Sequence, residues 1–291
     1  MRRQQSLQAS AAPPRPLIRR VWQQPSGKVG MVLTAIMLVI AVGGYLFADV
    51  ITGHYPTDVI GQPFDSAGIA GTDIQGRSVA SRVLAGGLTL LGYSLVATII
   101  GLALGTVLGL LAGYLGGVID WIIMRVNDVV LVFPALVLVL LVIAVFDPAA
   151  WIIVLVLGLV HAPWVARRIR NTVRSITSQD YILAARMYVT SHWTILTREI
   201  LPQITGRLAA EFALRLTYSI GLMASLSFLG VGIQPPTPDW GLMIKENLVA
   251  LTSQPWGVLL PIIAIALLTT GTRLLAHAIA QATALTAKHT S

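Results

Sequence analysis

Long apolar runs separated by short polar segments make up most of this chain. A transmembrane helix needs about 20 predominantly apolar residues, and six runs are long enough to supply one. They lie between Lys28 and Asp49, from Val83 to Ile119, from Asp128 to Asp147, before Arg167, from Arg207 to Gly232 and from Trp256 to Ala280. The pattern therefore predicts an all-α integral membrane protein with six transmembrane helices.

The polar segments between these runs divide the chain. We expect a basic tail over residues 1–28, a first transmembrane helix over 29–48, an extracytoplasmic segment over 49–82, a transmembrane core over 83–284 and a short tail over 285–291. Six crossings place both termini on one side of the membrane. Because the first tail is basic and contains no acid, the positive-inside rule predicts that both termini are cytoplasmic.

Composition and charge agree with a membrane protein and argue against nucleic acid as a partner. Apolar residues make up 55% of the chain and charged residues only 11%, which does not suit an ordinary soluble core. The formal net charge is +8, but the basic residues gather in the first tail and in residues 167–215, each beside an apolar run. Membrane orientation explains these blocks better than nucleic-acid binding. The chain has no cysteine, which excludes disulfides and thiolate metal sites.

One polar, helix-capable segment, residues 179–204, interrupts the core and is a candidate docking element. Asp180 can cap a short helix, Ala184 and Ala185 give it a face with almost no side chain, and Pro202 shortly follows its end. Small residues allow another backbone to approach closely. Arginines on both sides predict that this segment is cytoplasmic. On periodicity alone, an ordinary surface helix is the favoured alternative.

The second apolar run carries glycines at every fourth position, namely Gly101, Gly105, Gly109 and Gly113. Such a ladder lies on one helix face and lets a neighbouring helix pack at close range. We interpret it as a packing seam with another helix of this chain or of a partner.

Other residues within the apolar runs have both functional and structural interpretations. Arg125 and Asp128 lie three positions apart, so they can pair on one helical face; a functional role and simple snorkelling to the interface stay equally open. Pro134 and Pro163 predict kinks. His161 could relay protons, although a packed histidine is the more common case.

The segment after the fifth run contains three prolines within four positions and predicts a stiff, extended outer ledge. A short amphipathic helix is expected from Trp240 to Val249. Trp240 and Trp256 are expected at the headgroup level as interfacial anchors.

Four motifs of the chain are those of a known family. They are GTDIQGR at 71–77, LAGYLGGVIDWIIMRVNDVVLVFPAL at 111–136, DYILAAR at 180–186 with ILP at 200–202, and SLSFLGVGIQPPTPDWG at 225–241. Together they cover most of residues 71–265, and the last is highly specific. The chain thus resembles the six-span inner-membrane permease of oligopeptide, dipeptide and nickel ABC importers.

The resemblance implies a function and a set of partners. In that family the stretch around the paired alanines is a coupling helix that sits in a groove of the ATP-hydrolysing subunit. The implied partners are a second homologous permease, with which the chain forms a heterodimer, two cytoplasmic ATPase subunits, an extracytoplasmic substrate-binding protein and the lipid bilayer of the bacterial inner (plasma) membrane. The implied cargo is a peptide; nickel chelates or other small solutes are the alternative.

The resemblance also assigns residues to sites. The ATPase-coupling residues are Asp180, Tyr181, Ala184, Ala185, Arg186, Val189, Leu201 and Pro202. Residues expected to line the translocation path are Ser219, Gly221, Ser225 and Ser227, for which helix packing is the competing explanation. The expected docking surface for the binding protein contains Pro235, Pro236, Asp239 and Trp240.

Three positions depart from the family pattern. Val189 stands where the coupling motif usually has glycine, and Leu183 where the wider superfamily often has glutamate. Docking through apolar contact is therefore favoured over a salt bridge. Ser78 replaces the outer aspartate that usually follows the Gly-Arg pair.

The chain has no Gly-Lys-Ser or Gly-Lys-Thr loop, so it is not expected to be an enzyme or to hold a cofactor. ATP and Mg²⁺ are expected on the partner ATPases. Two other classes of membrane protein stay open. An ion-coupled secondary transporter would need acids near the centre of a span, and none is found there. A membrane scaffold would show the same glycine seam and basic loops, and only the coupling-helix resemblance argues against it.

Overall fold

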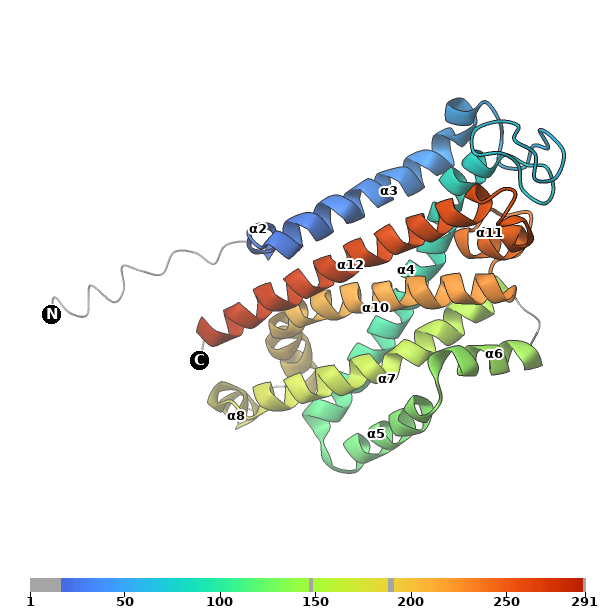
Figure 1. Cartoon of the computed structure of the whole chain (residues 1–291). Coiled ribbons are helices and arrows are strands. Elements are labelled where there is room, and N and C mark those ends of the chain that lie inside the picture. The colour runs from blue at the N-terminus through green and yellow to red at the C-terminus, as the bar shows by residue number, and fades with distance from the viewer. Residues whose placement is uncertain (1–16, 147–148, 188–190, 290–291) are drawn as a thin grey trace, which may run out of the picture.

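The computed structural model describes residues 17–146, 149–187 and 191–289, and most of them form helices (Figure 1). The elements, in chain order, are α2 (Leu17–Trp22), α3 (Pro25–Thr52), α4 (Val79–Leu115), α5 (Gly117–Val132), α6 (Ala135–Val145), α7 (Ala150–Thr177), α8 (Asp180–Met187), α9 (His192–Thr194), the π-helix η1 (Ile195–Ile200), α10 (Leu201–Leu229), α11 (Trp240–Asn247), the 3₁₀-helix η2 (Leu248–Ala250) and α12 (Trp256–His289). The long helices form one elongated bundle. Helices α2 and α8 and the last turns of α12 lie at one end of it, here called the inner end, and α11 lies at the other, outer end (Figure 1).

Five helices are long and apolar enough to cross a membrane, namely α3, α4, α7, the continuous run from α9 to α10, and α12. Helices α5 and α6 pass the same test together but are bent by 86°, so this pair is a sixth candidate span in broken form. The all-α membrane fold predicted from the apolar pattern is thus confirmed. The expected start of the third span at Asp128 is wrong, because its first helix already begins at Gly117; that helix ends at Val132 and the second begins at Ala135.

The break has a local cause in Pro134, where a kink was predicted. A proline disfavours the helical conformation in the residue before it. Phe133 accordingly has extended dihedral angles, with φ −83° and ψ 133°, and ends α5. Pro134 itself is the N-cap residue of α6. The chain can therefore restart as a helix in a new direction.

Helices α4 and α7 pack along the glycine ladder, and this confirms the predicted seam. A Cβ atom added at Gly105 would lie 2.5 Å from the Cβ of Val165, and one added at Gly109 would lie 2.8 Å from the Cβ of Ile169. Gly101 and Gly113 meet His161 and Val173 of α7 in the same way. The neighbour of the seam is therefore another helix of this chain.

The outer half of the bundle has a core that includes Leu90, Ile153, Met223 and Trp240. Trp240 is fully buried, and its indole N–H donates to the carbonyl oxygen of Val83 at 2.7 Å. The expectation that Trp240 anchors the chain at the headgroup level is therefore wrong: it anchors α11 to α4 from inside the protein. Its amphipathic sequence neighbours do form the expected short helix, α11.

Candidate functional site

Helix α8, the first helix of the expected docking segment, is attached to the bundle by a buried side chain. It begins at Asp180, two residues after the C-cap of α7 at Ser178. Ile182 is 0% exposed and belongs to an apolar cluster with Ile176 of α7 and Ile195 and Ile200 of η1. Because α7 and η1 enclose Ile182, a shift of α8 must either carry these two elements along or open a cavity.

Two polar contacts reinforce this attachment. The side-chain amide of Gln203 in α10 donates to the Tyr181 hydroxyl at 2.6 Å. The Tyr114 hydroxyl, near the inner end of α4, lies 2.8 Å from Nδ1 of His192, with the two rings edge to face. The segment after α8 is therefore tied to α4 as well as to α10.

The path from α8 into α10 contains a widened turn. Over Ile195–Ile200 the backbone forms a π-helix, and the N–H of Leu201 bonds to the carbonyl of Leu196, five residues earlier. Pro202 has no N–H, and its ring would crowd the carbonyl four residues before it, so a wider turn fits here. The expectation that Pro202 follows the end of the docking helix is wrong: that helix ends at Met187, and Pro202 lies in the first turn of α10.

The remaining predicted coupling residues are placed as follows. Ala184, Ala185 and Arg186 belong to α8, but their side chains lie outside the described part of the structure, and Val189 lies outside the described residues altogether. Leu201 is half-buried and Pro202 is exposed.

Ion pairs join α5 to the inner half of α7. The Asp120 carboxylate accepts hydrogen bonds from Arg170, one of them at 2.6 Å, and from Arg174. Asp128 pairs with Arg167 at 2.6 Å. The predicted pairing of Asp128 with Arg125 does not form, and the Arg125 guanidinium instead lies 5.5 Å from the centroid of the Trp121 ring. The partner of Asp128 comes from α7 because α5 lies against that helix.

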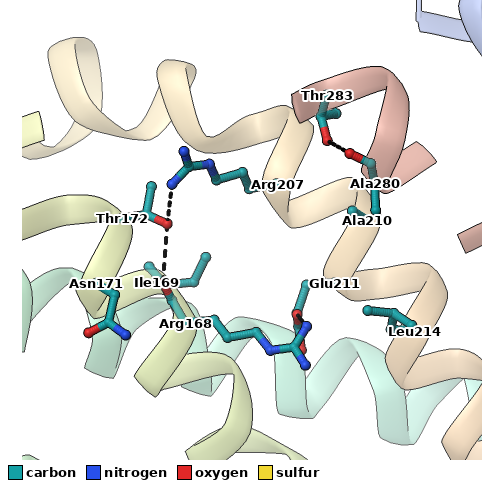
Figure 2. A pocket seen from close by; sticks show the side chains of 10 residues that line it. All are labelled: Arg168, Ile169, Asn171, Thr172, Arg207, Ala210, Glu211, Leu214, Ala280 and Thr283. Atoms are coloured by element: carbon teal, nitrogen blue, oxygen red, sulfur yellow. Dashed lines mark hydrogen bonds and ion pairs between the residues drawn. The ribbon is translucent and has the colours of Figure 1, made fainter. Parts of the chain in front are cut away.

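A further ionic chain connects α7 and α10. Glu211 is buried, and its carboxylate lies 2.9 Å from Arg168 of α7 and 2.9 Å from Arg215 of its own helix. Arg168 and Glu211 also line a cleft of about 410 Å³, which Figure 2 shows between α7, α10 and the inner part of α12. Arg207 reaches across this cleft to the Thr172 hydroxyl at 2.7 Å. Sequence reasoning missed Glu211, although an acid placed four positions from an arginine on either side, Arg207 and Arg215, is a detectable signal.

The four expected path residues do not share one face of α10. Ser219 is buried and lies 2.8 Å from the Thr98 hydroxyl and 2.9 Å from Nε2 of His161. Ser227 is also buried and accepts a hydrogen bond from the N–H of Ile233. Ser225 is exposed, and a Cβ added at Gly221 would meet no atom within 4 Å. Of these four residues, Gly221 and Ser225 are the two that face open space. His161 has the packed arrangement, hydrogen-bonded to Ser219.

At the outer end, the four residues expected to dock the binding protein differ in exposure. Pro235 and Pro236 are exposed. Asp239 and Trp240 are fully buried, and the Asp239 carboxylate caps α11 by accepting from the N–H of Leu242 at 2.9 Å. Burial raises the pKa of Asp239 to about 6, despite its hydrogen bond from Leu242. Asp239 and Trp240 thus hold the ledge in place from beneath.

A buried cluster, which we call the outer clasp, ties the segment between α3 and α4 to α4 and α11. Arg82 is 0% exposed and pairs with Asp73 and, at 3.0 Å, with Glu246. Arg77 pairs with the same Asp73 carboxylate at 2.8 Å, and the N–H of Ile74 donates to the Asn247 side chain. Burial alone would raise the pKa of Asp73, but the backbone N–H of Arg77 and the guanidinium groups of Arg82 and Arg77 hold it below its ordinary value.

Comparison with known proteins finds a matching family and relatives for more than half of this chain. The family model for the binding-protein-dependent transport system inner membrane component matches residues 105–284. The glutathione transport system permease protein GsiD of Shigella dysenteriae serotype 1 is 38% identical over 195 residues, which are 67% of this chain and 64% of that protein. The protein of the same name from Pectobacterium atrosepticum is 33% identical over 233 residues, 79% of this chain and 77% of the relative. The match to the Shigella protein thus spans just under two thirds of its length.

Proposed function

The chain belongs to the family of binding-protein-dependent transport system inner membrane components, and on that premise we propose that it is one permease subunit of an ATP-driven importer. It forms half of a translocation path, and a second, homologous permease forms the other half. Two cytoplasmic ATPase subunits bind ATP and Mg²⁺, and an extracytoplasmic binding protein delivers the solute. Both termini face the cytoplasm.

The observation that carries this proposal is the attachment of α8. ATP binding closes the two ATPase subunits on each other, and the groove that holds α8 moves with them. Because Ile182 is enclosed by α7 and η1, and Tyr181 is bonded to Gln203, this movement passes into α7 and α10. Displacement of packed helices as rigid bodies is a common form of switching transition. The path then opens alternately to the two sides of the membrane.

The substrate class we propose is a short peptide. Two relatives carry the printed name of glutathione transport permeases, and glutathione is a modified tripeptide. Peptides of different sequence share the backbone and the terminal charges, so a wide path that contacts few side chains suits them. Selection among peptides then falls to the binding protein.

Reconstitution in vesicles tests this proposal. The chain is incorporated with its sister permease and ATPases, and the binding protein is added outside together with glutathione or a dipeptide. We expect uptake that requires both ATP and the binding protein. Vesicles that hold this chain alone provide the control, because uptake without ATPases would contradict the proposal. A nickel chelate in place of the peptide tests the alternative cargo.

A further inference from the structure

The break between α5 and α6 leaves a hollow beside α7 and α10 that no assigned site uses. It consists of two adjoining cavities of about 260 and 320 Å³, which share Ala135, Val160 and Trp164 as lining residues. The larger cavity is lined by the apolar side chains of residues 130–135, Val160 and Trp164. The smaller one is also lined by Arg168 and Arg215. The hollow therefore has one apolar half and one cationic half.

Arg215 is held in the cationic half in an unusual environment for a guanidinium group. Its side chain is 6% exposed, and its guanidinium carbon lies 5.9 Å from the ring centroid of Trp164 and 5.0 Å from that of Tyr218. The two rings give favourable cation–π contacts but no hydrogen bonds. Both rings are partly exposed at the mouth of the hollow.

The charges around Arg215 do not balance. Two guanidinium groups, those of Arg168 and Arg215, flank one carboxylate, that of Glu211. His161, which also lines the hollow, is bonded to Ser219. Among the described residues, Arg215 Nε and Glu211 Oε1 have no aligned hydrogen-bond partner although they lie 2.9 Å apart. The group is thus one negative charge short, and part of its hydrogen-bonding capacity is unused.

Arg168 is 53% exposed and keeps access to solvent, but Arg215 is only 6% exposed and shares its single carboxylate partner with Arg168. A buried arginine held in this way is costly unless it serves a site. A guanidinium fork matches a carboxylate, with which it can form two parallel, charge-assisted hydrogen bonds. The adjoining apolar cavity would accept a hydrocarbon group attached close to that carboxylate. We propose that the hollow binds the free carboxylate of a solute in transit, with Arg215 and Arg168 holding the carboxylate and the apolar half holding the adjacent side chain.

This subsite rests on the proposed function, since it names the chemistry by which that path recognises its solute. Arg168 lines both the hollow and the cleft of Figure 2. The cleft lies on the inner side of the Arg168–Glu211 ion pair. A solute carboxylate that competes with Glu211 for Arg168 weakens the contact between α7 and α10 there. The Arg168–Glu211 pair is therefore the barrier that a carboxylate loosens on its way inward.

Equilibrium binding to the full chain in nanodiscs of uncharged phosphatidylcholine tests the subsite without the transport partners. The probes are the dipeptide alanyl-phenylalanine and its C-terminal amide. We expect the acid to bind about tenfold more tightly than the amide, as charge-assisted hydrogen bonds allow. Equal affinity of acid and amide for the wild-type chain would overturn the proposal.

Variants with opposite expected signs separate binding from a structural role. Arg215→Gln should abolish the preference for the acid, whereas Glu211→Gln, which removes the resident competitor, should increase it. Arg207→Gln changes an arginine outside the hollow and should leave the preference unchanged. A purely structural role would lower binding of acid and amide alike in both hollow variants, and that result, or a preference that survives Arg215→Gln, would overturn the proposal.

Two further comparisons test for a lipid in the hollow and distinguish failure of the subsite from failure of the proposed transport function. If nanodiscs containing anionic phosphatidylglycerol abolish acid binding, and Arg215→Gln removes this inhibition, the hollow is a lipid phosphate site and the proposal fails. If the wild-type chain shows no preference for the acid but still supports ATP-driven uptake, the proposed subsite is rejected and the transport function is kept. If the chain prefers the acid but supports no ATP-driven uptake, the proposed transport function is rejected and the subsite is kept.

Discussion

Tyr181 of α8 accepts a hydrogen bond from Gln203 of α10, across 21 intervening residues, and the neighbouring Ile182 is fully enclosed by α7 and η1. The hydrogen bond lies at an exposed position, where its net contribution is small. The buried isoleucine therefore supplies most of the attachment. This gives α8 a firm mechanical connection to two membrane helices.

Ile182→Ala should loosen that connection. Truncation of a buried isoleucine to alanine costs about 2–5 kcal/mol, mainly through the cavity that it leaves. We expect α8 to detach locally, so that uptake falls while the ATPases still hydrolyse ATP. Met187→Ala, at an 81% exposed position of the same helix, is the control and should leave uptake intact. Normal uptake by the Ile182→Ala importer would argue against transmission through this side chain.

The α4–α7 seam makes a prediction in which one substitution has opposite effects at two positions. Gly105→Ala places a Cβ 2.5 Å from atoms of α7, and such overpacking costs about 1–3 kcal/mol. Gly92→Ala, on the same helix, meets no atom within 4 Å and should be neutral or stabilising by up to about 1 kcal/mol through helix propensity. Thermal unfolding of both variants in detergent measures the difference. A Gly105→Ala protein as stable as the wild type would mean that the helices can separate without loss.

Sequence patterns predicted those parts of the fold that depend on regular spacing within one helix. The glycine ladder repeats every four residues, so the sequence alone predicts that its glycines share one face of the helix. Pro134 acts on the residue directly before it, and the break there was likewise foreseeable. The 86° change of direction was not, because it depends on how α6 packs against α7.

The errors arose where a residue has several possible partners. Arg125 is the nearest base to Asp128 in its own helix, but Arg167 comes close only after α5 packs against α7. Trp240 has the composition of an interfacial anchor, yet α4 and α10 leave room for it in the core. Ser219 and Ser227 were grouped with Gly221 and Ser225 by residue type, and their burial depends on which face of α10 meets other helices. Pairwise tertiary contacts of this kind leave no local signal.

Two aspartates near α5 should differ in their effect on stability. Asp128 and Arg167 are about half exposed, and such surface pairs contribute about 0–1 kcal/mol. Asp120 is only 8% exposed and accepts hydrogen bonds from both Arg170 and Arg174, so its charge-assisted bonds contribute about 1.5–3 kcal/mol. Chemical unfolding of Asp120→Asn and Asp128→Asn compares them directly. Equal losses in the two variants would show that burial does not strengthen the Asp120 cluster.

Stability at the outer end should depend on pH through Asp239. Its pKa is about 6 in the folded chain and 3.8 without the protein environment, so the folded state binds the proton more tightly. Stability from this group is therefore present below pH 3.8 and is lost as the pH rises towards 6, by about 3 kcal/mol. Asp239→Asn keeps the capping oxygen and should flatten the stability profile over that window. An unchanged profile in thermal unfolding from pH 4 to 7 would contradict this assignment.

Asp73 should contribute with the opposite sign. Its pKa is lowered in the folded chain, because its hydrogen bond from Arg77 and the charges of Arg82 and Arg77 together outweigh the effect of burial. The stability that it supplies is thus present above pH 3.8 and is lost as the pH falls through the folded-state pKa. Replacement by asparagine should reduce the loss of stability in acid, leaving Glu246 as the titrating carboxylate of the outer clasp, and should lower stability at neutral pH. If the Asp73→Asn variant lost as much stability in acid as the wild type, another group would be responsible for that loss.

The number of solute molecules imported per ATP hydrolysed tests the central claim, that movement of the ATPases enters the membrane helices through α8. The test compares Ala185→Glu with Ala185→Ser, which keeps the small face, in the reconstituted importer. We predict that the glutamate variant lowers this ratio by about tenfold, within the usual range of coupling free energies, and that the serine variant changes it little. A ratio in the glutamate variant equal to that of the wild type would contradict the account.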